Sequence, residues 1–102
     1  MKKGMESAQT KLKRMLDQHE LTRGMYVRVH GDHLIAGREE PVGPNGDREK
    51  QDRVRFTQLA TLTYGPSVKR HTGRWERTPF SGSLKQMVDT VLSFMQHLVA
   101  PY

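Results

Sequence analysis

The chain changes its hydrophobic period twice, and these changes limit the folds that it can adopt. Apolar residues recur at steps of three and four over residues 5–16, alternate with polar residues over residues 25–36 and 53–64, and return to helical spacing over residues 84–99. The first and last patterns are typical of amphipathic helices, and the middle one is typical of strands with one buried face. The sequence therefore predicts an α+β fold, a two-layer sandwich. In it, an antiparallel meander of four or five strands carries an N-terminal and a C-terminal helix on one face.

The first helix is predicted from about Ser7 to His19, with Ser7 as its N-cap. Its apolar face comprises Met5, Ala8, Leu12, Met15 and Leu16. Residues 1–6 are expected to form a flexible N-terminal tail. Residues 7–102 are expected to form a single domain, because a chain of 102 residues has the ordinary size of one domain.

The second helix is predicted to begin after Ser83, which forms a capping-box pattern with Gln86, and to end before Pro101. Its apolar stripe is wide. The stripe comprises Leu84, Met87, Val88, Val91, Leu92, Met95, Leu98 and Val99. We expect this stripe to lie against the apolar face of the sheet.

The dipeptide Gly31-Asp32 predicts a tight hairpin between two short strands. A two-residue loop pairs His30 with His33 and continues to the pairs Val29–Leu34, Arg28–Ile35 and Val27–Ala36. This register gives an apolar face of Val27, Val29, Leu34 and Ala36 and a mixed face of Tyr26, Arg28, His30, His33 and Ile35. A shift of one residue would exchange the two faces.

The rest of the sheet region is predicted to contain an exposed loop, one long strand and two short strands. Residues 39–52 contain Pro41, two glycines and five acidic residues, and we interpret them as an exposed, mobile loop. Residues 53–64 alternate as one long strand with a bulge near Gln58 and Leu59. A turn is expected at Gly65-Pro66-Ser67, followed by short strands at residues 68–71 and 74–78.

Basic residues outnumber acidic ones by 17 to 11, and the acidic excess is confined to residues 39–52. The predicted sheet is therefore more basic than the net charge of +6 suggests. A surface that neutralises phosphates needs Lys and Arg on one face, preferably with aromatic rings for stacking. The candidate binding residues lie around one tryptophan and comprise Arg28, Arg55, Lys69, Arg70, Arg74, Trp75 and Arg77. We expect a small basic binding module that takes single-stranded nucleic acid or an acidic partner on an exposed sheet face.

Other interpretations fit the same residues. Trp75 can pack against the core, which would leave an ordinary solvated basic face. The protein can also be a non-catalytic interaction or structural domain that acts through its helix faces. Phe94 lies off the main helical stripe, and Met95 and Leu98 approach the end of the chain, so a homodimer through the C-terminal helix is a further hypothesis.

The inventory of reactive residues argues against catalysis and against a bound cofactor. The chain has no Cys, which excludes disulfides and thiolate chemistry, and of its five His only His30 and His33 are predicted neighbours. The nearest third ligand, Asp32, points away from the strand face, so no metal site is expected. No nucleophile elbow or phosphate-binding glycine loop occurs, and no apolar run could cross a bilayer. We expect a cytoplasmic protein that is not an enzyme and has no membrane partner.

The order helix, meander, helix in a small basic chain resembles double-stranded RNA-binding domains and the Alu-domain proteins of the signal recognition particle. Double-stranded RNA-binding domains begin their last helix with a motif of the Lys-Lys-x-Ala-Lys type. Here that helix opens with Ser83-Leu84-Lys85-Gln86-Met87, which contains one basic residue. The resemblance therefore implies an architecture alone, and it assigns no binding residue to this chain.

Overall fold

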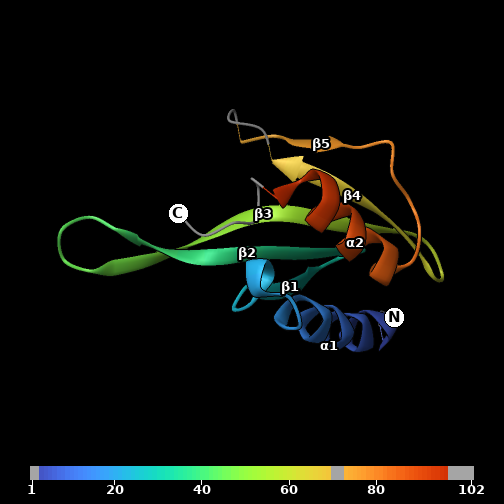
Figure 1. Cartoon of the computed structure of the whole chain (residues 1–102), viewed down its shortest axis with the longest axis horizontal. Helices are drawn as coiled ribbons and strands as arrows, with labels where there is room; N and C mark the ends of the chain where they lie inside the picture. Colours follow the sequence, from blue (N-terminus) through green and yellow to red (C-terminus); the bar gives the residue numbers. More distant parts are fainter. Residues whose placement is uncertain (1–2, 70–72, 97–102) are drawn as a thin grey trace.

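In a computed structural model, the chain folds into one antiparallel sheet and two helices (Figure 1). The structure describes residues 3–69 and 73–96. The elements in chain order are α1 (Lys3–Asp17), the 3-10 turn η1 (Glu20–Thr22), β1 (Tyr26–His30), β2 (His33–Val42), β3 (Asp47–Ala60), β4 (Thr63–Lys69), β5 (Trp75–Arg77) and α2 (Leu84–Phe94). The strands pair in sequence order, β1-β2-β3-β4-β5. The predicted fold class, an α+β two-layer meander, is confirmed.

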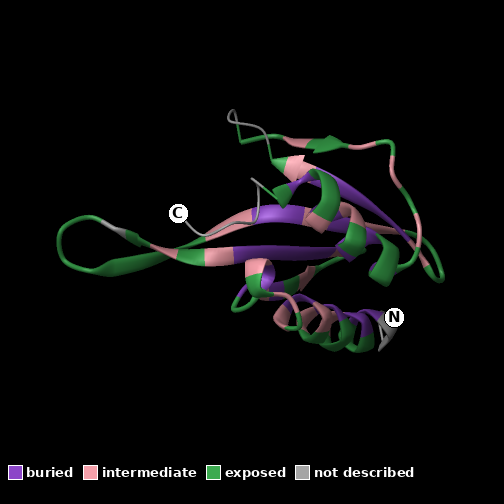
Figure 2. Cartoon of the chain, viewed as in Figure 1, coloured by how far each residue is buried: buried purple, intermediate pink, exposed green. Residues whose placement is uncertain are grey.

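A single hydrophobic core joins both helices to one face of the sheet, and Figure 2 shows the buried segments concentrated between these layers. The strands contribute alternate residues, so that Leu34, Ala36, Val54 and Phe56 all point to the helices. Their partners are the helical stripes predicted from the sequence. These are Met5, Ala8, Leu12 and Leu16 of α1 and Leu84, Met87, Val88 and Val91 of α2, with Met95 just after it.

The first helix begins one turn earlier than predicted. It starts at Lys3, so Ser7 lies inside the helix, and Met5 is 1% exposed in the core. The prediction of a flexible tail is therefore wrong for residues 3–6. The physical reason is that Met5 continues the apolar stripe toward the N-terminus, and burial of a whole side chain outweighs the preference of a serine for the N-cap.

The second helix is capped as predicted. The Ser83 hydroxyl accepts a hydrogen bond from the Gln86 backbone N–H at 3.2 Å, and the Gln86 side chain accepts one from the Ser83 N–H at 2.9 Å. Met95 is buried, so it belongs to the core and not to an apolar excess at the surface. Leu98, Val99 and Pro101 lie outside the described residues.

The β1–β2 hairpin has the predicted register, with His30 opposite His33 and Arg28 opposite Ile35. The prediction of a loop over residues 39–52 is wrong, because most of this segment extends the β2–β3 hairpin. Glu39 pairs with Lys50 and Val42 with Asp47, and the turn between these strands uses Gly43 and Gly46 at positive φ. The ribbon of residues 39–50 is exposed nearly throughout and projects from the body of the molecule (Figure 1); we call it the arm.

The boundary between β3 and β4 also differs from the prediction. Thr61 and Leu62 form the turn, whereas residues 65–67 lie inside β4 and are buried. A proline is tolerated there because the Pro66 carbonyl faces the end of β5, where it accepts from the Thr78 N–H at 3.1 Å. The ladder to β3 therefore needs no donor from Pro66. The predicted bulge is confirmed by a register shift between Gln58 and Ala60.

Over residues 3–69 and 73–96, no helix has the length and apolar character needed to cross a membrane.

Candidate nucleic-acid interface

The second face of the sheet is covered by neither helix, and we call it the open face. One row of cross-strand neighbours crosses all five strands of this face: Arg28, Ile35, Arg55, Ser67 and Arg77. Neighbouring strands lie about 4.8 Å apart, so the arginines on β1, β3 and β5 follow one another at intervals of about 10 Å. Ile35 and Ser67 between them are buried, 3% and 0% exposed. The row therefore presents cationic side chains above a closed floor.

Trp75 lies beside this row on β5, the edge strand of the sheet. Its register partner on β4 is Lys69, whose Nζ lies 5.8 Å from the centre of the indole ring. The Arg55 guanidinium lies over the same ring at 5.0 Å. Trp75 is half-buried and does not belong to the hydrophobic core cluster. The interpretation that packs Trp75 into the core is therefore wrong.

The structure brings together five of the seven predicted binding residues. Arg28, Arg55, Lys69, Trp75 and Arg77 share the open face. Arg74 is exposed immediately before β5, where no strand pairing assigns it to a face. Arg70 lies outside the described residues.

The electrostatics of the open face reflect this concentration of cations. Burial lowers the pKa of Arg55, and the neighbouring Arg77 lowers it further. Burial also lowers the pKa of His33, with added contributions from the charges of Arg55 and His30. The two imidazole rings stack with centroids 6.4 Å apart, and His33 Nδ1 lies 2.9 Å from the Thr57 hydroxyl. Burial is the main cause of both pKa shifts, and neighbouring positive charge adds to each.

One acidic residue of the open face was missed by sequence reasoning. Asp52 accepts hydrogen bonds from Tyr26 Oη at 2.5 Å and Arg28 Nη2 at 2.6 Å. Burial opposes its ionisation, but the hydrogen bonds from Arg28 and Tyr26 outweigh that effect and hold the pKa of Asp52 below its ordinary value. Tyr26 reaches Asp52 across Gly37, where a Cβ atom would lie 2.5 Å from the tyrosine oxygen. Arg28 is therefore partly neutralised, and the open cations are those nearer Trp75.

A bulge explains why Asp52 reaches the open face. Ala36 pairs with Val54 and Gly37 with Asp52, which leaves Arg53 as an extra residue on β3. Simple alternation would put Arg53 beside Arg55. Instead Arg53 is 8% exposed and its guanidinium pairs with Glu40. The one local signal of this bulge is Gly37, a glycine inside β2 at the register shift.

Two buried polar atoms lie along the arginine row without a hydrogen-bond partner among the described residues. They are Nε of Arg55 and the hydroxyl oxygen of Ser67, which belong to directly opposed residues of β3 and β4. Buried polar atoms in native structures are normally paired.

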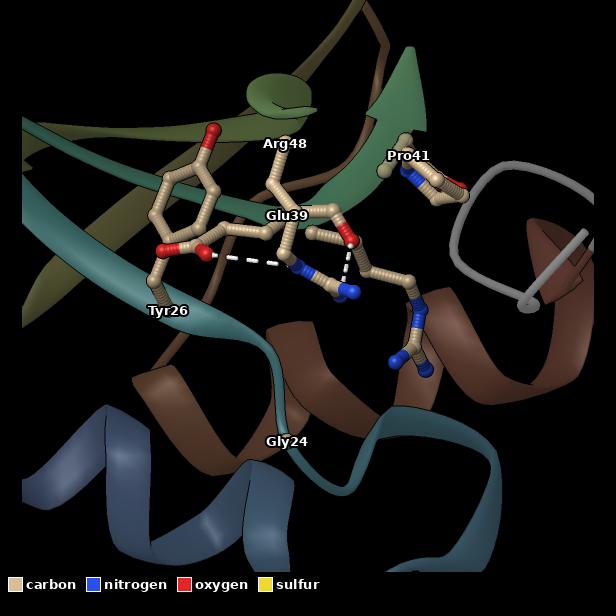
Figure 3. A pocket seen from close by; sticks show the side chains of 7 residues that line it. Gly24, Tyr26, Glu39, Pro41 and Arg48 are labelled. Carbon is tan, nitrogen blue, oxygen red and sulfur yellow. Dashed lines mark hydrogen bonds and ion pairs between the residues drawn. The ribbon is translucent and has the colours of Figure 1, made fainter. Parts of the chain in front are cut away.

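A polar hollow of about 410 Å³ lies at the base of the arm, between the chain after Gly24 and strands β2 and β3. Figure 3 shows Arg48 directed at Glu39, with its Nε 3.7 Å from the Glu39 carboxylate and its Nη2 3.0 Å from the Glu39 carbonyl. Arg38 donates to the Leu21 and Arg23 carbonyls. The arginines of this hollow are thus engaged within the protein, and the open face is the stronger candidate.

The described residues contain no group of three His, Asp or Glu side chains that could hold a metal ion. No protein-family model, curated protein or solved structure matches the chain, so the candidate interface rests on its own geometry.

Proposed function

We propose that this protein binds single-stranded nucleic acid on the open face of its sheet. The observation that carries the proposal is the convergence of Arg55 and Lys69 on the half-buried ring of Trp75, with Arg77 close to Arg55 in the same row. Cations neutralise phosphates in any sequence, and an indole ring stacks on any base. A sheet surface with both groups suits a strand whose bases are unpaired, because the bases of a duplex are already stacked on one another.

The cations around Trp75 outnumber the nearby acids, of which Asp52 is close enough to Lys69 for that charge to lower its pKa. This imbalance supports a polyanionic ligand over a purely structural role. Asp52 is engaged by Arg28 and Tyr26, and no described acidic residue forms an ion pair with Arg55, Lys69 or Arg77. Like charges gathered on one face destabilise a fold slightly and raise its association rate with anions. The arrangement is therefore better explained by a ligand than by stability.

The proposal is tested by fluorescence anisotropy with a labelled single-stranded oligonucleotide at rising salt. We expect the logarithm of the affinity to fall linearly with that of the salt concentration, by about 0.7 per phosphate contacted. The double variant Arg55→Gln/Arg77→Gln should reduce this slope by about 1.4. Arg14→Gln is the matched control, since Arg14 is an exposed arginine on α1 in the other layer. Absence of binding, or equal effects of both variants, would refute the proposal.

Stacking is tested separately from charge. Trp75→Ala should weaken oligonucleotide binding by about 1–3 kcal/mol if the ring stacks on a base. Trp75→Phe should recover part of this loss because it keeps an aromatic face. Polyglutamate serves as the competing acidic partner. If polyglutamate binds as tightly as the oligonucleotide and Trp75→Ala affects neither, the open face recognises charge alone, and an acidic protein replaces nucleic acid as the ligand.

A further inference from the structure

A second candidate site lies at the end of the molecule opposite the arm. A groove of about 480 Å³ lies between α1, the β3–β4 turn and the start of α2, three elements that come together at one end of Figure 1. Its volume is within the range of about 300–1,000 Å³ that is typical of small-molecule sites. The groove belongs to the helix layer, so it is independent of the open face and of the function proposed above.

The floor of the groove is apolar and is part of the folded core. Ala8, Tyr64 and Leu84 line it and are 7%, 5% and 6% exposed. Met15 and Leu62 complete its apolar lining. Leu62 is 76% exposed in the turn between β3 and β4, a position where polar residues are usual. A large aliphatic side chain held in water at the edge of an apolar hollow favours a ligand with an apolar body.

The walls of the groove are fixed by the backbone. Tyr64 and Gly82 exchange two backbone hydrogen bonds of 2.7 and 3.0 Å, which hold the chain before α2 against β4. The capping box of Ser83 and Gln86 then sets the direction in which α2 begins. The groove is thus formed before any ligand arrives, and binding would not have to order a loop.

Both charged residues that line the groove are lysines, Lys11 from α1 and Lys85 from α2. Lys85 lies 3.5 Å from Asp89, but both side chains are exposed, so this pair is weak. Among the described residues, none forms an ion pair with Lys11. Two lysines from different helices therefore border an apolar floor, and the lining contains no acidic residue.

We infer that the groove binds a free medium-chain fatty acid. Its hydrocarbon chain would lie on Ala8, Tyr64 and Leu84, and its carboxylate would lie between Lys11 and Lys85. The hydrocarbon chain is complementary to the apolar floor, and the single anionic head group is complementary to the two lysines. A long polyanion such as a nucleic acid is complementary to the two lysines but not to the apolar floor. The groove and the open face are therefore assigned to different ligands.

The experiment titrates decanoate, below the concentration at which it forms micelles, into the ¹⁵N-labelled protein. Chemical-shift changes are expected around Ala8, Leu62 and Leu84 and not around Trp75, with a stoichiometry of one. Decylamine, which has the same chain and the opposite charge, should bind at least tenfold more weakly. Binding of both ligands with equal affinity, or shift changes spread over the whole chain, would overturn the inference.

Two pairs of variants separate the groove from general surface effects. Leu62→Ser should weaken decanoate binding several-fold, whereas Leu59→Ser, which changes a half-exposed leucine outside the groove, should not. Lys11→Gln with Lys85→Gln should weaken it about five- to tenfold, whereas Lys13→Gln should leave it unchanged. None of these side chains belongs to the buried core, so the variants are expected to fold. Equal effects within either pair would refute the assignment.

Discussion

The two faces of the sheet are built from alternate residues of the same strands, but different physical requirements determine which residue types occupy each face. On β3, Phe56 is fully buried against the helices, whereas Arg55 and Thr57 on either side of it belong to the open face. The helix face is specified by burial, since each apolar side chain there removes surface from water. The cations of the open face contribute little to folding. A change on one face should therefore alter stability, and a change on the other should alter binding.

The largest expected effect comes from substituting, one at a time, two neighbouring residues that lie on opposite faces. Phe56→Ala should destabilise the protein by about 3–5 kcal/mol, because it leaves a cavity in a core whose helices cannot fully collapse onto it. Arg55→Gln should cost less than about 1 kcal/mol, the value of its contact with the Trp75 ring. Urea denaturation of both variants measures the difference. Comparable losses would show that the open face is also part of the stabilising core.

Arg53 provides the next largest effect, because the bulge moves it from one face to the other. Its guanidinium pairs with Glu40, and the two side chains are 8% and 15% exposed. Arg53→Gln removes the positive partner of a nearly buried carboxylate and should cost about 2–3 kcal/mol in the free energy of unfolding.

The matched control is Arg48→Gln in the arm. Arg48 bridges Glu39 at 3.7 Å, but both side chains are about half exposed, so its loss should stay within about 0.5 kcal/mol. If Arg53→Gln proved equally mild while oligonucleotide binding fell, Arg53 would act with the open face, and its pair with Glu40 would contribute little to stability.

The same bulge marks how far the sequence could predict this molecule. Periodicity located both helical stripes, the turn dipeptide Gly31-Asp32 set the β1–β2 register, and five of the candidate binding residues share one face. These features depend on local spacing. The position of Asp52 depends on which residues of β2 and β3 pair, and nothing within β3 records that pairing. The sequence predicts a loop in place of the arm for a similar reason, since an exposed ribbon has no apolar face to show its alternation.

The helix layer leaves one large apolar side chain uncovered among the described residues of α2. Phe94 is 68% exposed, and its ring stacks on Phe80 with centroids 5.7 Å apart. We predict that Phe94→Glu abolishes any self-association of the protein, because a two-fold contact would bring two carboxylates together. It should cost about 0.5–1.5 kcal/mol in stability through the lost ring contact.

Sedimentation over a concentration series compares the wild type, Phe94→Glu and Ser93→Glu. The serine is exposed beside Phe94, so its replacement adds the same charge while keeping the aromatic ring. A wild type that remains monomeric at every concentration would end the homodimer hypothesis. A folded Phe94→Glu monomer beside a dimeric wild type would support it.

The smallest expected effect is a pH dependence that originates on the open face. His33 titrates below its ordinary pKa of 6.5 in the folded protein, owing to burial and to the charges of Arg55 and His30. As the pH falls through 6.5, His33 of the unfolded chain binds a proton while His33 of the folded chain remains neutral. The free energy of unfolding should therefore decline below pH 6.5 and level off once folded His33 is also protonated.

Urea denaturation between pH 8 and pH 5 measures this decline, and His33→Gln should remove it. His19→Gln, which replaces a histidine after α1 on the helix side, should retain it. A wild type that gains stability toward pH 5, or a His33→Gln variant with an unchanged decline, would contradict the view that the open face resists further positive charge.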